Sequence, residues 1–338
     1  MHRIAPFLLI VTVVVLAVFI YRFFFFSPVP TETPGTDEKL TLAIALQPIA
    51  AIPLLAQSQG FFEAEGITVE FKAFPSGKRA LNEGLFTGEA DMATSTEIPV
   101  TVALMEERPL VILASVGTAD NINRIIARKD RGIKTPSDLK GKTVATQHAS
   151  AVHYFLTLFL QSYAVSDKKT TLRFMKAEAL PEALAKGEID AFSMREPYIS
   201  QAKERLGENA VIFGMPGLYI QSELLVTTRA FNQNRPETVR KVLKALSRAE
   251  AYAKEHPAEA IESVASMLNI PSDIYEKMWE EIVPRVRLDQ SLLILLESQA
   301  RWILDNTIVP GAPFPNCLEA IEQEALRAVR PDAVTIIR

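Results

Sequence analysis

The chain is poor in the residues that build disulfide or metal-bound frameworks. Its 338 residues include one cysteine, Cys317, and four histidines, His2, His148, His153 and His256. One thiol cannot form an internal disulfide or a cysteine-based zinc or iron–sulfur site. No histidine pair has the HExxH spacing of a metalloprotease, and His148 and His153, five residues apart, are not expected to share a helical face. We therefore expect no metal and no cofactor.

The chain also lacks an excess of positive charge. The chain has 36 Lys and Arg against 40 Asp and Glu, a formal net charge of −4, and no basic cluster. Such a chain is a poor nucleic-acid binder. The other proportions, 48% hydrophobic and 22% charged residues with 14 Gly and 21 Pro, are those of a globular protein. They exclude a disordered, collagen-like or coiled-coil class, and the length predicts about two domains.

The N-terminus carries a long apolar run. Residues 4–21 have no charge, and after Arg22 the apolar run resumes through Phe26. This length is close to the ~20 residues that cross a membrane and exceeds the roughly 7–15 of a secretory signal core. We expect residues 1–26 to contain an uncleaved membrane anchor (4–26) rather than a cleaved signal, and no cysteine nearby allows lipid attachment. Arginines on both sides leave the orientation open.

Residues 27–39 are rich in Pro and Thr and predict a short tether. Beyond them, short apolar runs alternate in two series with helical patterns, among them residues 77–86, 180–186 and 198–206. The predicted strands are residues 40–46, 67–74, 90–94 and 110–116, then 142–146, 171–177, 190–194 and 210–213. Strand–helix–strand units of this length predict parallel strand pairs. The sequence therefore predicts an α/β fold with two lobes.

The chain is expected to leave the first lobe and return to it. Residues 122–128 are a further apolar segment, and the charged stretch 129–140 reads as the crossing between lobes. A strand at 224–228 is expected to return, and helices follow to the C-terminus. These helices are residues 236–255, 257–268, 272–281, 289–306 and 317–329. We therefore assign residues 40–128 and 218–338 to the first lobe and 129–217 to the second.

Four segments carry a family resemblance. They are GFFEAEGITVEF (60–71), ALNEGLFTGEADMATS (80–95), SDLKGKTVAT (137–146) and ALAKGEIDAFSMREPY (183–198). In this order the chain, over residues 40–335, resembles the periplasmic solute-binding proteins of the nitrate, sulfonate and taurine type, a family that includes binding proteins for thiamine-pyrimidine precursors and riboflavin. The resemblance implies the two-lobed type II periplasmic binding protein fold, here preceded by one transmembrane helix.

The resemblance also implies a function. Members capture a small polar organic solute between the lobes by hinge closure and deliver it to the transmembrane subunits of an ABC permease. The protein is then expected to be a monomer on the periplasmic or extracytoplasmic face, tethered to the inner membrane by residues 4–26, or secreted if that segment is cleaved.

Polar side chains at the carboxyl ends of the predicted first-lobe strands are candidate ligand contacts, because ligands bind outside these ends near helix N-termini. Each has a structural alternative, as a turn residue or a helix cap. The candidates in this lobe are Gln47, Pro48, Ser76, Gly77, Thr94, Ser95, Thr96 and Glu97.

The second lobe offers an equivalent set. Gln147, His148 and Ser150 stand at a predicted helix start, where His148 is a ligand contact or a helix cap. Arg195 and Glu196 follow a strand, and Glu196-Pro197 matches the acid–proline pair that the family often has there. Arg195 could hold an anionic group or pair with an acidic neighbour. Gln221 precedes the returning strand and completes the ligand-binding set.

The charges suggest a ligand class. Glu97 and Glu196, if both face the cleft, would repel nitrate or a simple sulfonate. This favours a larger, polar or partly cationic organic ligand. Two other functions remain open. One is a membrane-tethered sensory ectodomain that signals through another protein. The other is an enzyme on the same fold, which the missing cysteine-rich motif, Ser-His-Asp spacing and phosphate loop disfavour.

Overall fold

The computed structural model describes residues 38–165 and 170–337. The expected membrane segment at residues 4–26, and nearly all of the tether, lie outside this part of the chain. Within the described ranges, no helix combines the length and apolar character needed to cross a membrane.

The first lobe is built on a six-stranded mixed sheet with the order β11-β4-β10-β3-β1-β2. The returning strand β10 lies between β3 and β4 and runs antiparallel to both, whereas β1 and β3 are parallel. The strands are β1 (Glu38–Ala45), β2 (Ile67–Phe74), β3 (Met92–Thr96), β4 (Leu110–Ala119), β10 (Gln221–Thr228) and β11 (Ile282–Val283).

The second lobe has a five-stranded sheet with the order β7-β6-β8-β5-β9. Its strands are β5 (Arg124–Arg128), β6 (Thr143–Thr146), β7 (Thr171–Phe174), β8 (Ala191–Met194) and β9 (Ala210–Phe213). The assignment of residues 124–128 to the first lobe is therefore wrong. Strand β5 pairs with β8 and β9, and its three central residues are buried on both faces of this sheet. The charged stretch after it forms 3-10 turns within the second lobe rather than the crossing.

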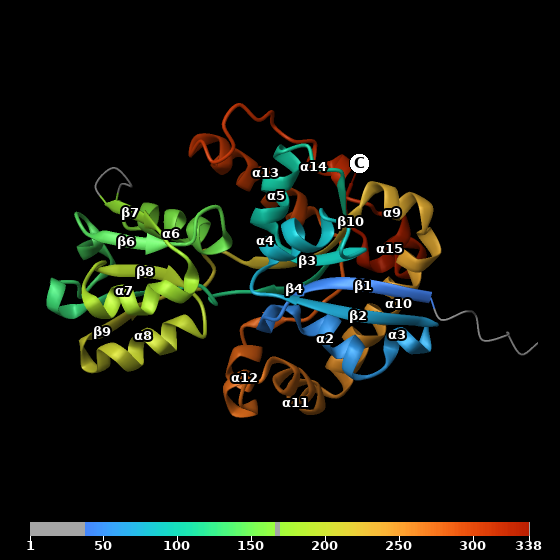
Figure 1. The fold of residues 1–338 in the computed structure, drawn as a ribbon, viewed down its shortest axis with the longest axis horizontal. Helices are drawn as coiled ribbons and strands as arrows, with labels where there is room; N and C mark the ends of the chain where they lie inside the picture. Colours follow the sequence, from blue (N-terminus) through green and yellow to red (C-terminus); the bar gives the residue numbers. More distant parts are fainter. Residues whose placement is uncertain (1–37, 166–169, 338) are drawn as a thin grey trace, which may run out of the picture. The chain divides into compact units, whose positions relative to one another are not determined.

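Helices cover both sheets (Figure 1). The second lobe carries α6 (Ala151–Ser162), α7 (Leu180–Lys186) and α8 (Tyr198–Leu206). The first carries α2 (Ala51–Ser58), α3 (Phe61–Ala64), α4 (Gly77–Arg79), α5 (Glu97–Met105), α9 (Arg229–Asn234), α10 (Pro236–Glu255), α11 (Pro257–Leu268), α12 (Ser272–Trp279), α13 (Gln290–Asp305), α14 (Cys317–Ala320) and α15 (Glu324–Val329). Helix α10 shows why these segments fold: Val239, Val242, Leu243 and Leu246 recur at helical spacing and are buried in the core of the first lobe, where α10 packs mainly against α2, α3 and α15.

Two predicted helices are interrupted. The segment predicted as residues 77–86 is the short helix α4 followed by a π-helical turn over residues 80–85. The segment predicted as 317–329 breaks between α14 and α15, because Ile321 forms a bridge to Ile112 and the Glu322 amide donates to the Ile112 carbonyl at 2.9 Å. Pairing with the edge of the sheet thus outweighs helix continuation there.

Two short crossings join the lobes, one between β4 and β5 and one between β9 and β10 (Figure 1). The crossings are bonded to each other: the Asp120 carboxylate accepts from the Gly217 amide at 2.9 and 3.0 Å, and Asn123 Nδ2 donates to Gln221 Oε1 at 3.2 Å. This is the arrangement of a hinge.

The lobes also share apolar packing. Ile98 of α5 and Trp302 of α13 belong to the same buried cluster as Phe155 and Phe159 of the second-lobe helix α6. Trp302 packs edge-on against Tyr154, and Tyr154 against Tyr219 of the returning crossing, both with ring centroids 5.1 Å apart. Helix α13 is thus a support on which the second lobe rests.

Candidate ligand-binding cleft

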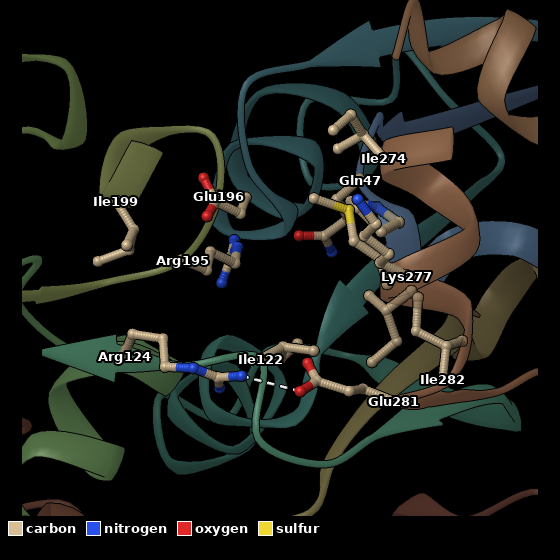
Figure 2. A pocket seen from close by; sticks show the side chains of 13 residues that line it. Gln47, Ile122, Arg124, Arg195, Glu196, Ile199, Ile274, Lys277, Glu281 and Ile282 are labelled. Carbon is tan, nitrogen blue, oxygen red and sulfur yellow. Dashed lines mark hydrogen bonds and ion pairs between the residues drawn. The ribbon is translucent and has the colours of Figure 1, made fainter. Parts of the chain in front are cut away.

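A cavity of about 260 Å³ lies between the lobes beside the crossings. Figure 2 shows Arg195 and Glu196 on one side and Gln47 with the helix α12 on the other. The lining residues come from the loop and 3-10 turn after β1, the first crossing, the start of β5, the loop after β8 with the start of α8, and the segment from α12 to β11. They are Gln47, Pro48, Ile49, Ile122, Arg124, Arg195, Glu196, Ile199, Ile274, Lys277, Met278, Glu281 and Ile282.

Arg195 is the central cation of the cavity. It directly follows β8, is half-buried, and extends toward Gln47 across the cavity (Figure 2). Among the described residues its guanidinium has no hydrogen-bond or ion-pair partner. Burial lowers the pKa of Arg195, and the charges of Glu223 and Glu97 oppose that shift. An arginine stays charged under such a shift, so the cavity presents an unpaired cation suited to an oxyanion.

Glu223 lies behind Gln47, on the first-lobe side of the cavity. Gln47 Nε2 donates to Glu223 Oε2 at 2.8 Å, and the Glu223 side chain is fully buried. Oε1 of Glu223 has no hydrogen-bond partner among the described residues. Burial raises the pKa of Glu223 to about 8, although the charge of Arg195 and the bond from Gln47 pull it down.

Glu97 does not line the cavity. It is the first residue of α5 and is fully buried, and its carboxylate accepts from Tyr219 Oη, from Gln299 Nε2 at 3.1 Å and from the Ser222 amide at 3.2 Å. Burial raises its pKa to about 7, and these three donors moderate the rise. Glu97 therefore ties the returning crossing and α13 to the first lobe.

The other first-lobe candidates lie outside the cavity lining. Ser76 caps α4 by accepting from the Arg79 amide at 3.4 Å. A Cβ atom at Gly77 would lie 2.6 Å from the Ser95 Cα, so this position needs glycine for close backbone approach. Thr94, Ser95 and Thr96 are buried, and Thr94 Oγ1 has no partner among the described residues.

Gln221 has a similar environment. It is fully buried at the start of β10, where its Oε1 accepts from Asn123 and its Nε2 has no described partner.

The candidates at the start of α6 are also absent from the lining. Ser150 caps α6 by accepting from the His153 amide at 3.4 Å, Gln147 lies in the loop before it, and His148 is exposed. His148 precedes α6 and His153 lies in its first turn, so the two do not share a helical face, although their ring centroids are 5.8 Å apart. Burial lowers the pKa of His153 to about 4. The described residues contain no group of three or more potential metal ligands.

The remaining lining consists of apolar and charged groups. Ile49, Ile122, Ile199, Ile274, Met278 and Ile282 supply the apolar surface. Arg124 pairs with Glu281 at 2.8 Å, whereas Glu196 accepts from the Ser200 amide at 3.1 Å and has no cationic partner among the described residues. Within the described part of the chain, Arg195 and the exposed Lys277 are therefore two unpaired cations against one unpaired carboxylate, an excess of positive charge that suits a bound anion.

Sequence reasoning missed two parts of this site. Helix α12 was predicted as a helix but not as a wall of the cavity, and Glu223 was outside the predicted returning strand. The signal for Glu223 was present: Gln221 and Glu223 are two polar residues at strand spacing directly before the apolar run 224–226.

The chain is similar to a known family and to several named proteins. A family model described as NMT1/THI5 like matches residues 47–260. A protein of Bacillus subtilis (strain 168) named for the binding of aliphatic sulfonates is 26% identical over 251 residues, 72% of this chain and 74% of that protein. The taurine-binding periplasmic protein of Escherichia coli (strain K12) is 24% identical over 247 residues, 69% of this chain and 75% of that protein.

Solved structures agree in fold. The alkanesulfonate-binding protein SsuA from Xanthomonas axonopodis pv. citri, bound to MOPS, superposes with a TM-score of 0.72 at 21% identity, covering 85% of this chain and 99% of that one. The chain therefore has the α/β two-lobed periplasmic binding protein fold.

Proposed function

The chain belongs to the NMT1/THI5-like family, and from this premise we propose that it is the substrate-binding component of an ABC importer. It captures a small organic anion between its lobes. The observation that carries the proposal is Arg195, an arginine of the second lobe that extends unpaired into a cavity whose opposite wall is Gln47. A cation that is partly removed from water and has no carboxylate partner is costly unless a ligand supplies the counter-charge.

The ligand class follows from the lining. An anionic group fits between Arg195 and Gln47, and a short apolar body fits against the isoleucine and methionine side chains contributed by both lobes. The names of the relatives, which refer to aliphatic sulfonates and taurine, support this class. The earlier preference for a partly cationic ligand rested on Glu97 and Glu196. Glu97 is buried behind the cavity, and the one carboxylate of Glu196 is outweighed by the two cations Arg195 and Lys277, which are unpaired in the described chain.

Capture works by closure at the two crossings. The anion contacts Arg195 of one lobe and Gln47 of the other only when the cleft is closed, so binding shifts the population toward the closed form. The permease subunits then recognise that form on the extracytoplasmic face. The same binding step would serve a sensory ectodomain, and the identity of the membrane partner distinguishes the two roles.

An enzyme with a cysteine nucleophile is disfavoured by the position of Cys317. The thiol is buried, and burial raises its pKa to about 12. Reactive cysteines are accessible and have a lowered pKa.

The proposal is tested first by native mass spectrometry of the full chain, which is purified in detergent and is not refolded. Calorimetry then measures the binding of butanesulfonate, taurine, nitrate and a pyrimidine. A small anion that is released on denaturation, a protein mass of one chain, and saturable binding of a sulfonate support the proposal. No binding of any member of this panel would contradict it.

We further propose that residues 4–26 anchor the protein in the membrane. We expect the full chain to stay with membranes after an alkaline carbonate wash, whereas a variant that lacks residues 1–26 is released into the soluble fraction. The physical reason is the uncharged 18-residue run at positions 4–21, which is near the length of the hydrocarbon core. Release of both proteins, with loss of the N-terminal mass from the full chain, would instead indicate a cleaved signal.

A further inference from the structure

Directly behind the wall of the cleft lies a buried carboxyl whose charge would oppose the proposed ligand. Glu223 is fully buried on β10 and holds Gln47 through the 2.8 Å bond to its Oε2. Gln47 itself lines the cavity opposite Arg195 (Figure 2). An anion that contacts Gln47 therefore lies one side chain away from Glu223.

The charged groups that act on Glu223 are few. Arg195 approaches from the second lobe and favours the ionised carboxylate, and Glu97 on α5 disfavours it. The other neighbours, Gln47 from the loop after β1 and Thr94 from β3, are neutral, and their polar groups favour the ionised carboxylate less than Arg195 does. Arg195 makes no ion pair with Glu223, although Glu223 is the carboxylate that affects it most. A bound anion would neutralise the charge of Arg195, which is the main group that stabilises the ionised form of Glu223.

The size of the conflict can be bounded. Two like charges about 5 Å apart in a partly buried site repel strongly enough to weaken binding on the order of 100-fold. A neutral carboxyl removes this repulsion. Since Oε2 accepts from Gln47 and Oε1 has no described partner, the proton has a free position on Oε1. From there the O–H group can donate a hydrogen bond.

We propose that Glu223 determines the charge specificity of the cleft: the protein binds its anion with Glu223 in the neutral, protonated form, so that anion and proton are captured together. This inference rests on the proposed function, because it takes the anion to lie between Arg195 and Gln47. Burial of Glu223, which raises its pKa to about 8, already prepares the ligand-free protein for this state near neutral pH.

The test is calorimetry of the full chain with butanesulfonate, which remains ionised at all pH values used. We expect the dissociation constant to rise about tenfold from pH 7 to pH 9, because ligand-free Glu223 loses its proton over this range. Titrations at pH 8 in two buffers of different ionisation enthalpy should reveal an uptake of about half a proton per anion bound.

The variant Glu223→Gln keeps the shape and the neutral charge. It should bind butanesulfonate with a dissociation constant within about threefold of the wild-type value at pH 7, without pH dependence to pH 9 and without proton uptake. The matched control Glu196→Gln, which removes a carboxylate of the lining, should keep both the pH dependence and the uptake.

The outcomes separate the two proposals. Binding by the wild type that is independent of pH and takes up no proton would overturn the role of Glu223 and leave the proposed function standing. So would wild-type proton uptake that persists in Glu223→Gln. A folded wild-type chain that binds none of butanesulfonate, taurine and nitrate at pH 7 would overturn the anion-binding function itself. Proton uptake by the wild type is measured without any variant. The proposal can therefore be tested even if Glu223→Gln does not fold.

Discussion

Arg195→Gln is expected to weaken butanesulfonate binding by about 100-fold. The change removes the unpaired guanidinium of the cavity, and losing one partner of a desolvated charge pair costs about 2–5 kcal/mol, with tenfold in affinity for each ~1.4 kcal/mol. The affinity of Arg195→Lys should lie between those of the wild type and Arg195→Gln, because an ammonium keeps the charge but lacks the bidentate donor geometry of a guanidinium. Calorimetry at pH 7 measures all three affinities.

The matched control is Arg205→Gln. Arg205 belongs to α8 of the same lobe, is exposed and pairs with Glu182. Its removal should leave affinity unchanged, which separates the position of Arg195 from a general effect of net charge. Thermal unfolding of each variant checks that the fold is retained. Affinities of Arg195→Gln and wild type within twofold of each other would contradict the placement of the anion.

Glu97→Ala is expected to lower the free energy of unfolding by about 3–5 kcal/mol. The carboxylate accepts from Tyr219, Gln299 and Ser222 in a site without solvent access. Truncation would leave three buried donors without a partner, at about 1–3 kcal/mol each before relaxation or water entry. Denaturant unfolding measures the loss.

The loss should depend on pH. The folded pKa of Glu97, about 7, lies above its ordinary value of 4.5, so the wild type itself loses stability as pH rises through this interval. The difference between wild type and Glu97→Ala should therefore be about 1 kcal/mol larger at pH 6 than at pH 9. Glu106→Ala, an exposed change at the other end of α5, is the control and should cost less than about 0.5 kcal/mol. An equal loss of unfolding free energy in both variants would show that the buried hydrogen bonds of Glu97 do not stabilise the junction between the lobes.

Sequence reasoning predicted the strands and helices well where a segment is apolar throughout or has a clear helical period. It placed the helices 180–186, 198–206, 236–255 and 257–268 at their observed bounds. It missed the first part of β10 because Gln221, Ser222 and Glu223 are polar and read as a loop. Only the tertiary structure shows that they are buried, since β10 lies in the centre of the sheet.

The site divides in the same way. Gln47, Pro48, Arg195 and Glu196 line the cavity, and each directly follows a strand, a position that the sequence reveals. Lys277 and Met278 line it from a helix about 80 residues further along the chain, and no local pattern predicts that contact. The lobe boundary was misplaced for a related reason: a strand such as β5 carries no mark of which sheet it will join.

The shared packing of α13 with α6 has a mechanical consequence. A rotation that keeps Trp302 in contact with Tyr154 must have its axis near this contact, and points far from the axis travel furthest. Helix α12 lies on the opposite side of the crossings from α13 (Figure 1). The entrance of the cleft then lies between α12 and the second lobe, and the exposed side chains of Ile274 and Lys277 lie at its edge. The size and charge of this opening would set how fast a solute enters, separately from how tightly it is held.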